Sequence, residues 1–216
     1  MLNNYNMLRN PKRSRLSPQP CKSYVEPWEF DYELTTASTS DPVTLDEAKL
    51  FARIDDDTDD ALVTALISAA TKEVESQTGR ALMPQTWTAW LDNMPASNVL
   101  HLCKGRIASV SSITAYDDDG SEVLDTGSYL VDTDNARIGL IDSSTWPSGT
   151  RTFKTFAAEY VAGYADADAV PEWAKTVIKM LVASWYENRE TTTQDSQNSV
   201  PMGAKMIMQT NKVSRL

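Results

Sequence analysis

Two runs of aspartates are the side chains best suited to chemistry in this sequence. The first occupies residues 55–60 and is interrupted only by Thr58, and the second consists of Asp117, Asp118 and Asp119. Carboxylate oxygens are the ligands that Ca²⁺ and Mg²⁺ prefer. If the two runs met in the fold, they could hold Mg²⁺ as in a metal-dependent nuclease or transferase. A simpler interpretation, which we favour, needs no ion, because acids are common at helix starts and in turns.

The first run also permits a test for a calcium-binding loop. Asp55, Asp57 and Asp59 match the first three ligand positions of an EF-hand. The same loop requires a glycine where Asp60 stands and a bidentate glutamate where Leu66 stands. Both requirements fail, so the spacing excludes an EF-hand. We predict that the protein holds no metal and no other cofactor.

Other residues that often carry catalysis occur here in patterns that do not support it. The single histidine, His101, lies in a predicted strand, where a structural role is the commoner one. The sequence has no GxSxG nucleophile motif and no glycine-rich phosphate loop. Cys21 and Cys103 form neither a CxxC pair nor a zinc-binding spacing. We therefore expect no enzymatic activity.

The charge balance argues against a protein that grips DNA. Thirty acidic residues against twenty basic ones give a formal net charge of −10. Binding to duplex phosphates requires the opposite sign, whereas an acidic surface repels DNA or simply keeps a protein soluble. No apolar stretch approaches the roughly 18 residues that a membrane helix needs, and no apolar segment follows the basic residues near the N-terminus. We expect no membrane contact, and we expect the protein to stay in the cytoplasm until it assembles with its partners.

Helices must position the first aspartate run. Residues 44–54 are predicted to form a helix that opens with a capping box, in which Thr44 and Glu47 bind each other's backbone amides. Residues 58–79 are predicted to form a second helix, since apolar residues recur at spacings of three and four. It ends at Gly79, a favourable residue after a helix. The aspartates thus stand at the start of the second helix.

A third helix is predicted over residues 171–189. Pro171 opens it, at a position where a missing amide costs nothing. Large apolar residues then recur at every fourth position, while Lys175 and Lys179 lie on the opposite face. We expect this helix to pack on the second one.

The hydrophobic period changes between the second and third helices. Residues 84–164 contain several short runs rich in β-branched and aromatic residues, separated by turn signals such as Asp119-Gly120. Strands at such short intervals indicate a small antiparallel sheet. The predicted fold class is α+β, a small antiparallel helix bundle with an inserted antiparallel β-sheet.

Both ends of the chain differ from this core, which spans residues 41–190. Residues 1–40 are rich in proline but too aromatic for a plain flexible linker. Residues 191–216 start polar and continue into an apolar stretch rich in methionine, which suits adaptable contacts. We interpret both ends as extended arms that contact a partner or a neighbouring subunit, with a disordered arm and a frayed tail as the alternatives. The candidate contact residues are Tyr24, Trp28, Phe30 and Tyr32 in the first arm and Val200, Pro201, Met202, Met206, Ile207 and Met208 in the second.

A series of short motifs carries a family resemblance. It comprises PVTLDEAK at 42–49, RID at 53–55 before the acid run, AL at 61–62, AAT at 69–71, TGRAL at 78–82, QTW at 85–87, YVAGY at 160–164, VP at 170–171 and WYENRE at 185–190. In this order and spacing, the motifs resemble the head–tail connector (adaptor) proteins of tailed bacteriophages. The resemblance covers about residues 42–190 and leaves out the N-terminal extension.

The resemblance implies a structural protein. Similar connectors form a ring, typically of twelve copies, that lies beneath the portal, extends the DNA channel and docks the next neck or tail protein. The implied partners are other copies of the chain, the portal protein and that downstream protein, while DNA passes without specific binding. The implied location is the neck of the virion, after assembly in the host cytoplasm. In similar proteins the C-terminal segment reaches the portal, which here corresponds to the candidate residues in 200–208.

Two alternatives stay open on the sequence. The chain could be a tail-completion or stopper protein of the same neck, or a metal-dependent enzyme that uses the aspartate runs, which the residues favour least. For a ring, we expect a lumen lined by acids, with Asp117, Asp118 and Asp119 at an exposed turn as candidates.

Overall fold

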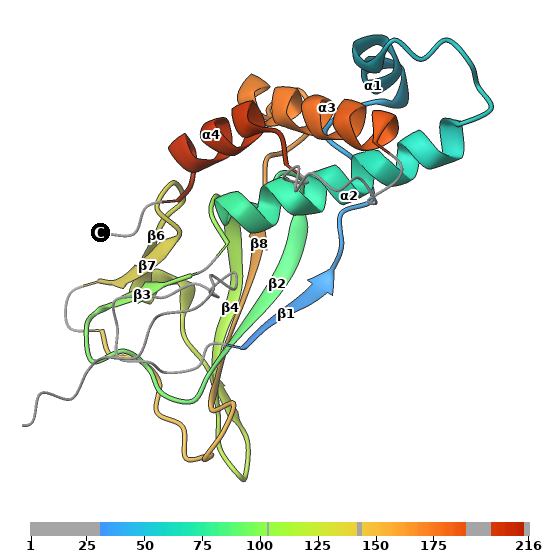
Figure 1. Cartoon of the computed structure of the whole chain (residues 1–216). Helices are drawn as coiled ribbons and strands as arrows, with labels where there is room; N and C mark the ends of the chain where they lie inside the picture. Colours follow the sequence, from blue (N-terminus) through green and yellow to red (C-terminus); the bar gives the residue numbers. More distant parts are fainter. Residues whose placement is uncertain (1–30, 103, 142–143, 189–199, 214–216) are drawn as a thin grey trace, which may run out of the picture.

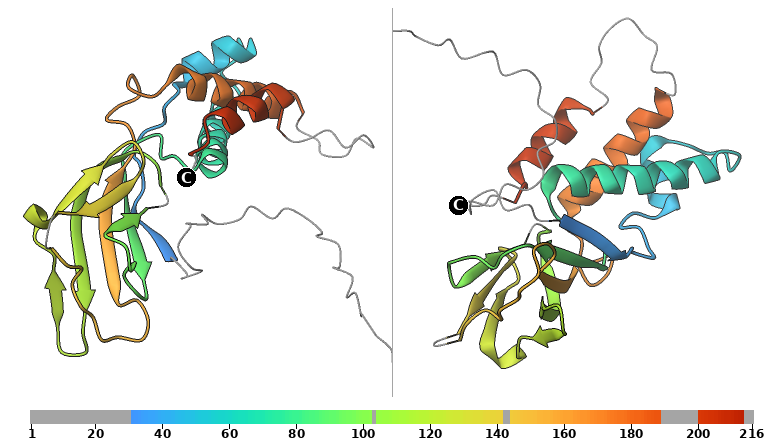
Figure 2. Two further views of the ribbon diagram at one scale, coloured as in Figure 1. Left: turned by 90° about the vertical axis from the view of Figure 1, so that its left-hand side faces the viewer. Right: turned by 90° about the horizontal axis from the view of Figure 1, so that it is seen from below.

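The computed structural model describes residues 31–102, 104–141, 144–188 and 200–213. These residues form two layers, a group of helices and, below it in Figure 1, a group of β-strands. Figure 2 shows the same separation from two further directions. Each layer has its own hydrophobic core. The α+β class predicted from the sequence is confirmed.

The helical layer agrees closely with the sequence pattern for three of its four helices, with ends that differ by at most two residues. The helices are α1 (Leu45–Ala52), α2 (Asp60–Thr78), α3 (Glu172–Glu187) and α4 (Met202–Thr210). The capping box is formed, since the Thr44 amide donates to the Glu47 carboxylate at 2.9 Å and the Glu47 amide to the Thr44 hydroxyl at 3.2 Å. Gly79 follows α2 in the left-handed conformation, with φ 71°. Helix α4 was not predicted, because its residues were expected to form an extended tail.

Helix α3 lies at the centre of this layer together with α2, because each of them contacts all three other helices. Its packing on α2 is confirmed, and the side chains of Val177, Ile178, Leu181 and Val182 are fully buried. The expectation for Lys175 was wrong, since this residue is only 8% exposed. Neighbouring helices cover more of α3 than the single apolar stripe suggested. The Lys175 ammonium still reaches the exposed Glu172 carboxylate, at 3.5 Å, so the charged end of the side chain extends toward solvent.

The β layer contains two antiparallel sheets where one was predicted. Its strands are β1 (Asp31–Thr36), β2 (Gln85–Leu91), β3 (Val99–His101), β4 (Ile107–Tyr116), β5 (Ser121–Val123), β6 (Tyr129–Asp132), β7 (Arg137–Leu140) and β8 (Phe156–Ala162). The five-stranded sheet has the order β1-β2-β8-β4-β5, and the three-stranded sheet has the order β3-β7-β6. The register places Ala89, Ala158 and Ile113 side by side on one face of the larger sheet. These residues share a core with Leu100 and Ile138 of the smaller sheet.

Strand β1 lies inside the segment that was interpreted as an arm. It pairs with β2 along its length, and the Trp90 indole donates to the Glu33 carboxylate at 3.2 Å. The hydroxyls of Thr35 and Thr88 lie 2.8 Å apart. Most of β1 is exposed. The strand nevertheless carries a short strand pattern, since Tyr32 and Leu34 alternate with Asp31 and Glu33. Its pairing partner follows some fifty residues later, which no local pattern reveals.

The end of α2 is fixed to the β layer by a half-buried carboxylate. Glu75 accepts hydrogen bonds from the Leu82 amide at 2.7 Å and from the Gln85 side-chain amide at 2.8 Å. Next to it, the Gly105 amide donates to the Gly79 carbonyl at 2.7 Å. Burial raises the pKa of Glu75, although these hydrogen bonds favour its charged form. The joint between the layers therefore contains a charge that folding partly desolvates.

Glutamine in place of Glu75 should keep both hydrogen bonds and remove the cost of burying a charge. Glu75→Ala leaves two donors without their acceptor and should lower the free energy of unfolding by about 1–3 kcal/mol. Because folding raises the pKa of Glu75, its contribution to stability falls as the pH rises through that raised value. Urea denaturation should therefore show Glu75→Gln gaining stability relative to the natural chain from pH 4 to pH 7. A relative gain at pH 4 that shrinks toward pH 7 would contradict this.

Candidate docking surfaces

The first aspartate run ties the start of α2 to the neighbouring helices. Lys49 of α1 binds the carboxylates of Asp57 at 2.5 Å and Asp60 at 2.7 Å, and these hydrogen bonds raise the pKa of Lys49. The Asp59 carboxylate accepts the Tyr186 hydroxyl of α3 at 2.7 Å. Asp56 accepts the amide of Thr58 at 2.8 Å. Four acids of this run thus serve intramolecular contacts.

The two aspartate runs do not meet in the fold. The first stands at the start of α2, and the second lies in the β4–β5 turn at the opposite end of the molecule (Figures 1 and 2). One ion shared by both runs is therefore excluded by geometry. Within the described part of the chain, no group of three or more His, Cys, Asp or Glu side chains is arranged to hold a metal ion.

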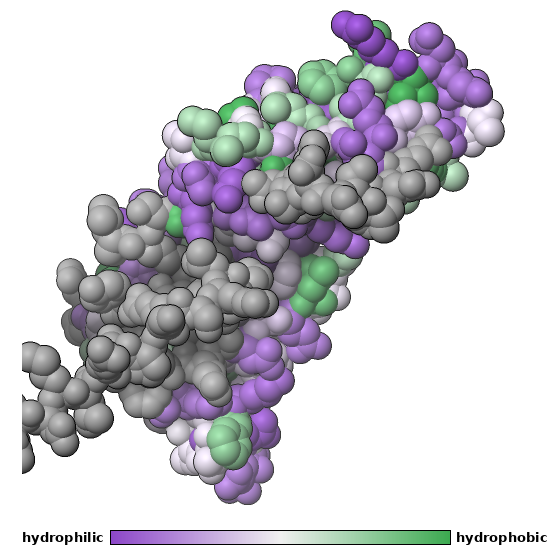
Figure 3. All heavy atoms as spheres, viewed as in Figure 1, coloured by the Kyte–Doolittle hydropathy of each residue, from purple (hydrophilic) through white to green (hydrophobic). Residues whose placement is uncertain are grey.

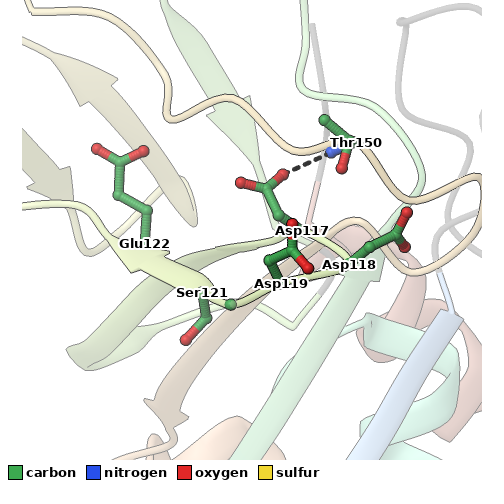
Figure 4. Close-up of a pocket in the computed structure, with 7 residues that line it drawn as sticks. Asp117, Asp118, Asp119, Ser121, Glu122 and Thr150 are labelled. Atoms are coloured by element: carbon green, nitrogen blue, oxygen red, sulfur yellow. Dashed lines mark hydrogen bonds between the residues drawn. The ribbon is translucent and has the colours of Figure 1, made fainter.

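The second run forms a turn beside the loop that precedes β8. Asp117 accepts the Thr150 amide at 2.8 Å, and its own amide donates to the Gly120 carbonyl at 2.9 Å. Figure 4 shows the Asp117 carboxylate turned toward Thr150, while Asp118 points away from it. Asp118 and Asp119 are exposed. The predicted turn is confirmed, and its place in a ring lumen stays a prediction.

The apolar residues of the C-terminal segment divide into a buried and an exposed set. In α4, Met208 is 3% exposed and Ala204 is fully buried, both in the helical core. Val200 and Ile207 are partly buried against the same core. After α4, the Val213 amide donates to the Thr78 carbonyl at 3.0 Å. Of the candidate portal contacts, only Met202 and Met206 present largely exposed side chains, and Pro201 is half-buried.

The aromatic candidates of the N-terminal arm are placed only in part. Tyr24, Trp28 and Phe30 lie outside the described residues, as do Cys21 and Cys103. Tyr32 belongs to β1 and packs, partly buried, against the core of the β layer. The sheet therefore uses at least one of these aromatic side chains itself.

Sequence reasoning missed an exposed apolar pair on α1. Leu50 is 82% exposed and Phe51 is 47% exposed. A signal was present, because the helix has more apolar residues than one buried stripe can use, and the excess must face solvent or a partner.

The family comparison covers the helical layer and strands β2 to β5 and β8 of the β layer. The model of the phage gp6-like head-tail connector protein family matches residues 42–127 and 147–212. The chain belongs to this family. The match includes all four helices, so it extends beyond residue 190, where the sequence motifs ended. The connector is thus a structural protein of the phage head–tail junction.

Solved structures with the same fold come from gene transfer agent (GTA) particles. A chain from the neck of an empty GTA particle, computed with sixfold symmetry, has a TM-score of 0.72 and 18% identity, covering 86% of the connector and 97% of that chain. A chain from the virion of a native GTA particle has a TM-score of 0.70 and 19% identity. This match covers 86% of the connector and 96% of that chain. A chain from the neck of a native GTA particle, computed with twelvefold symmetry, has a TM-score of 0.66 and 19% identity. This match covers 85% of the connector and 97% of that chain. No curated protein matches the connector.

None of the described helices has the length and apolar character to cross a membrane.

Two methionines of α4 provide a matched test of how this helix is held. Met208→Ala empties a buried position and should lower the free energy of unfolding by about 2–5 kcal/mol. Met206→Ala, two residues earlier on the exposed side, should change it by no more than about 0.5 kcal/mol. Urea denaturation of both variants measures the difference. Equal effects would show that α4 is not docked on the helical core in solution.

Proposed function

We propose that the connector forms a closed ring beneath the portal, extends the DNA channel and docks the next neck or tail protein. The family match over both layers carries this proposal. The fold supports it, since similar chains come from necks computed with sixfold and twelvefold symmetry. A ring of twelve copies fits both symmetries. In this role the protein acts by forming the ring and by binding its neighbours, and it has no catalytic step.

The charge of the chain suits a conduit for DNA. With a net charge of −10, a ring of copies repels the phosphate backbone instead of binding it. We propose that acids line the lumen, and the exposed Asp118 and Asp119 of the β4–β5 turn are the candidates. Asp117 anchors this turn to the loop before β8 by accepting the Thr150 amide.

The two ends of the chain are proposed to make the contacts outside the core. The core was expected to span residues 41–190. The large sheet also includes β1, and Ala204 and Met208 of α4 pack in the helical core. The segment 191–216 was expected to reach the portal, and that assignment stays a prediction. In the described conformation, it rests on the exposed side chains of Met202 and Met206.

Ring formation can be tested with the purified full chain and purified portal rings. Mass photometry and negative-stain microscopy should show rings of about twelve copies on one face of the portal, because twelve copies fit both the sixfold and the twelvefold symmetry of the similar necks. The chain without portal is the control and shows whether the ring forms alone. A strict monomer that ignores portal rings would overturn the proposal. A reconstruction with a basic lumen would overturn the lumen assignment alone.

A further inference from the structure

The exposed apolar residues of the helices gather at two places. Leu50 and Phe51 of α1 and Leu62 near the start of α2 are 82%, 47% and 38% exposed, and we call them the α1 patch. Met202 and Met206 of α4 are 70% and 63% exposed, and we call them the α4 patch. No other large apolar side chain of the described helices is exposed. Isolated exposed apolar residues are ordinary, but their restriction to two patches indicates contact surfaces.

The two patches lie at opposite ends of the helical layer. In Figure 1, α1 and the start of α2 are at one end of the layer and α4 is at the other, and Figure 2 shows the same arrangement from below. Helix α3 lies between them and contacts both α1 and α4. Figure 3 shows hydrophobic surface at each end. The patches therefore cannot meet within one copy.

The charges around the α1 patch are acidic. Residues 45–60 contain seven acids and two bases. One of the bases, Lys49, is already bound by two aspartates of the same run. Asp46, Asp55 and Asp56 are exposed near the patch. A partner of the α1 patch should therefore present apolar side chains among basic ones.

The charges around the α4 patch are basic. Residues 200–213 contain two lysines and no acid, and both Lys205 and Lys212 are exposed. Methionine side chains are flexible and fill apolar surfaces of varied shape. Because Ala204 and Met208 hold α4 on the helical core, the patch is presented on a fixed support. The α4 patch thus has the chemistry that the α1 patch calls for.

We propose that the α4 patch of one copy docks on the α1 patch of the next copy. This inference rests on the proposed ring and names the surfaces that build it. Two different, complementary surfaces at opposite ends of a subunit make a head-to-tail contact, which generates a ring when the rotation closes. The opposite charges orient the encounter, and the apolar side chains lose their exposure to water. A second copy is favoured over the portal as the occupant, because each copy of this chain carries both complementary surfaces, the α1 patch and the α4 patch.

A charge exchange tests the pairing directly. Leu50→Lys places a positive charge opposite Lys205 and Lys212, and Met206→Glu places a negative charge opposite the acids of the α1 patch. Each single variant should raise the protein concentration needed for half-assembly about tenfold or more, which corresponds to about 1.4 kcal/mol per contact. The double variant Leu50→Lys/Met206→Glu should recover assembly, because each contact then joins the introduced lysine of one copy to the introduced glutamate of the next. Mass photometry over a dilution series measures assembly, with portal rings present if the ring needs them.

Matched controls separate surface effects from folding effects. Leu130→Lys changes an exposed leucine of β6, 68% exposed and outside both patches, and should leave assembly unchanged. Circular dichroism melting of every variant should match that of the natural chain, because all the changed side chains are largely exposed.

The outcomes distinguish this inference from the function on which it rests. If the natural chain forms no ring with portal present, the proposed function fails. If the natural chain and both single variants form rings equally well, the ring stands and the inference is overturned. If Met206→Glu still forms rings but no longer binds the portal, the α4 patch belongs to the portal contact. If both single variants fail and the double variant does not recover, the two patches do not face each other.

Discussion

Burial of α3 is the interaction on which the rest of the structure depends. Its residues Val177, Ile178, Leu181 and Val182 are fully buried, and each such side chain contributes about 1.5–3 kcal/mol relative to exposure. Helix α3 contacts α1 and α2, which precede strands β2 to β8 in sequence, and α4, which follows them. It thereby closes the chain around the inserted β layer. Helix α2 shares this role, since it also contacts α1, α3 and α4.

The same burial fixes how the two ends of the helical layer face outward. A head-to-tail ring closes only if the angle between its two contact surfaces is constant from copy to copy. Helices α1 and α4 both contact α3, and Ala48 of α1 and Met208 of α4 are buried in the shared core. Both helices are therefore packed directly against α3. The positions of the α1 patch and the α4 patch are thus set by the helical core.

The β layer is attached to the helices over a short stretch, where two glycines of the family motifs have a physical reason. Gly79 ends α2 with φ 71°, and its carbonyl accepts the Gly105 amide. Gly163 has φ 121°, and a Cβ at this position would lie 2.2 Å from the Met83 carbonyl oxygen. Any larger residue there would push β8 away from the chain that links α2 to β2. The close approach of Gly163 to Met83 lets the five-stranded sheet begin directly after α2.

The sequence by itself determined three of the four helices, the fold class and the family, because caps and apolar periodicity are local and motif order needs no contacts. It did not reveal β1, whose exposed residues obtain their order from a partner some fifty residues away, or the second sheet, whose strands are very short. It placed Lys175 on the wrong face, since one helix's periodicity cannot tell how many neighbours cover it. Only the tertiary structure separated the two aspartate runs and divided the methionines of α4 into a buried and an exposed set. It also set Leu50 and Phe51 opposite them across the layer, because the position of a surface depends on packing between distant segments.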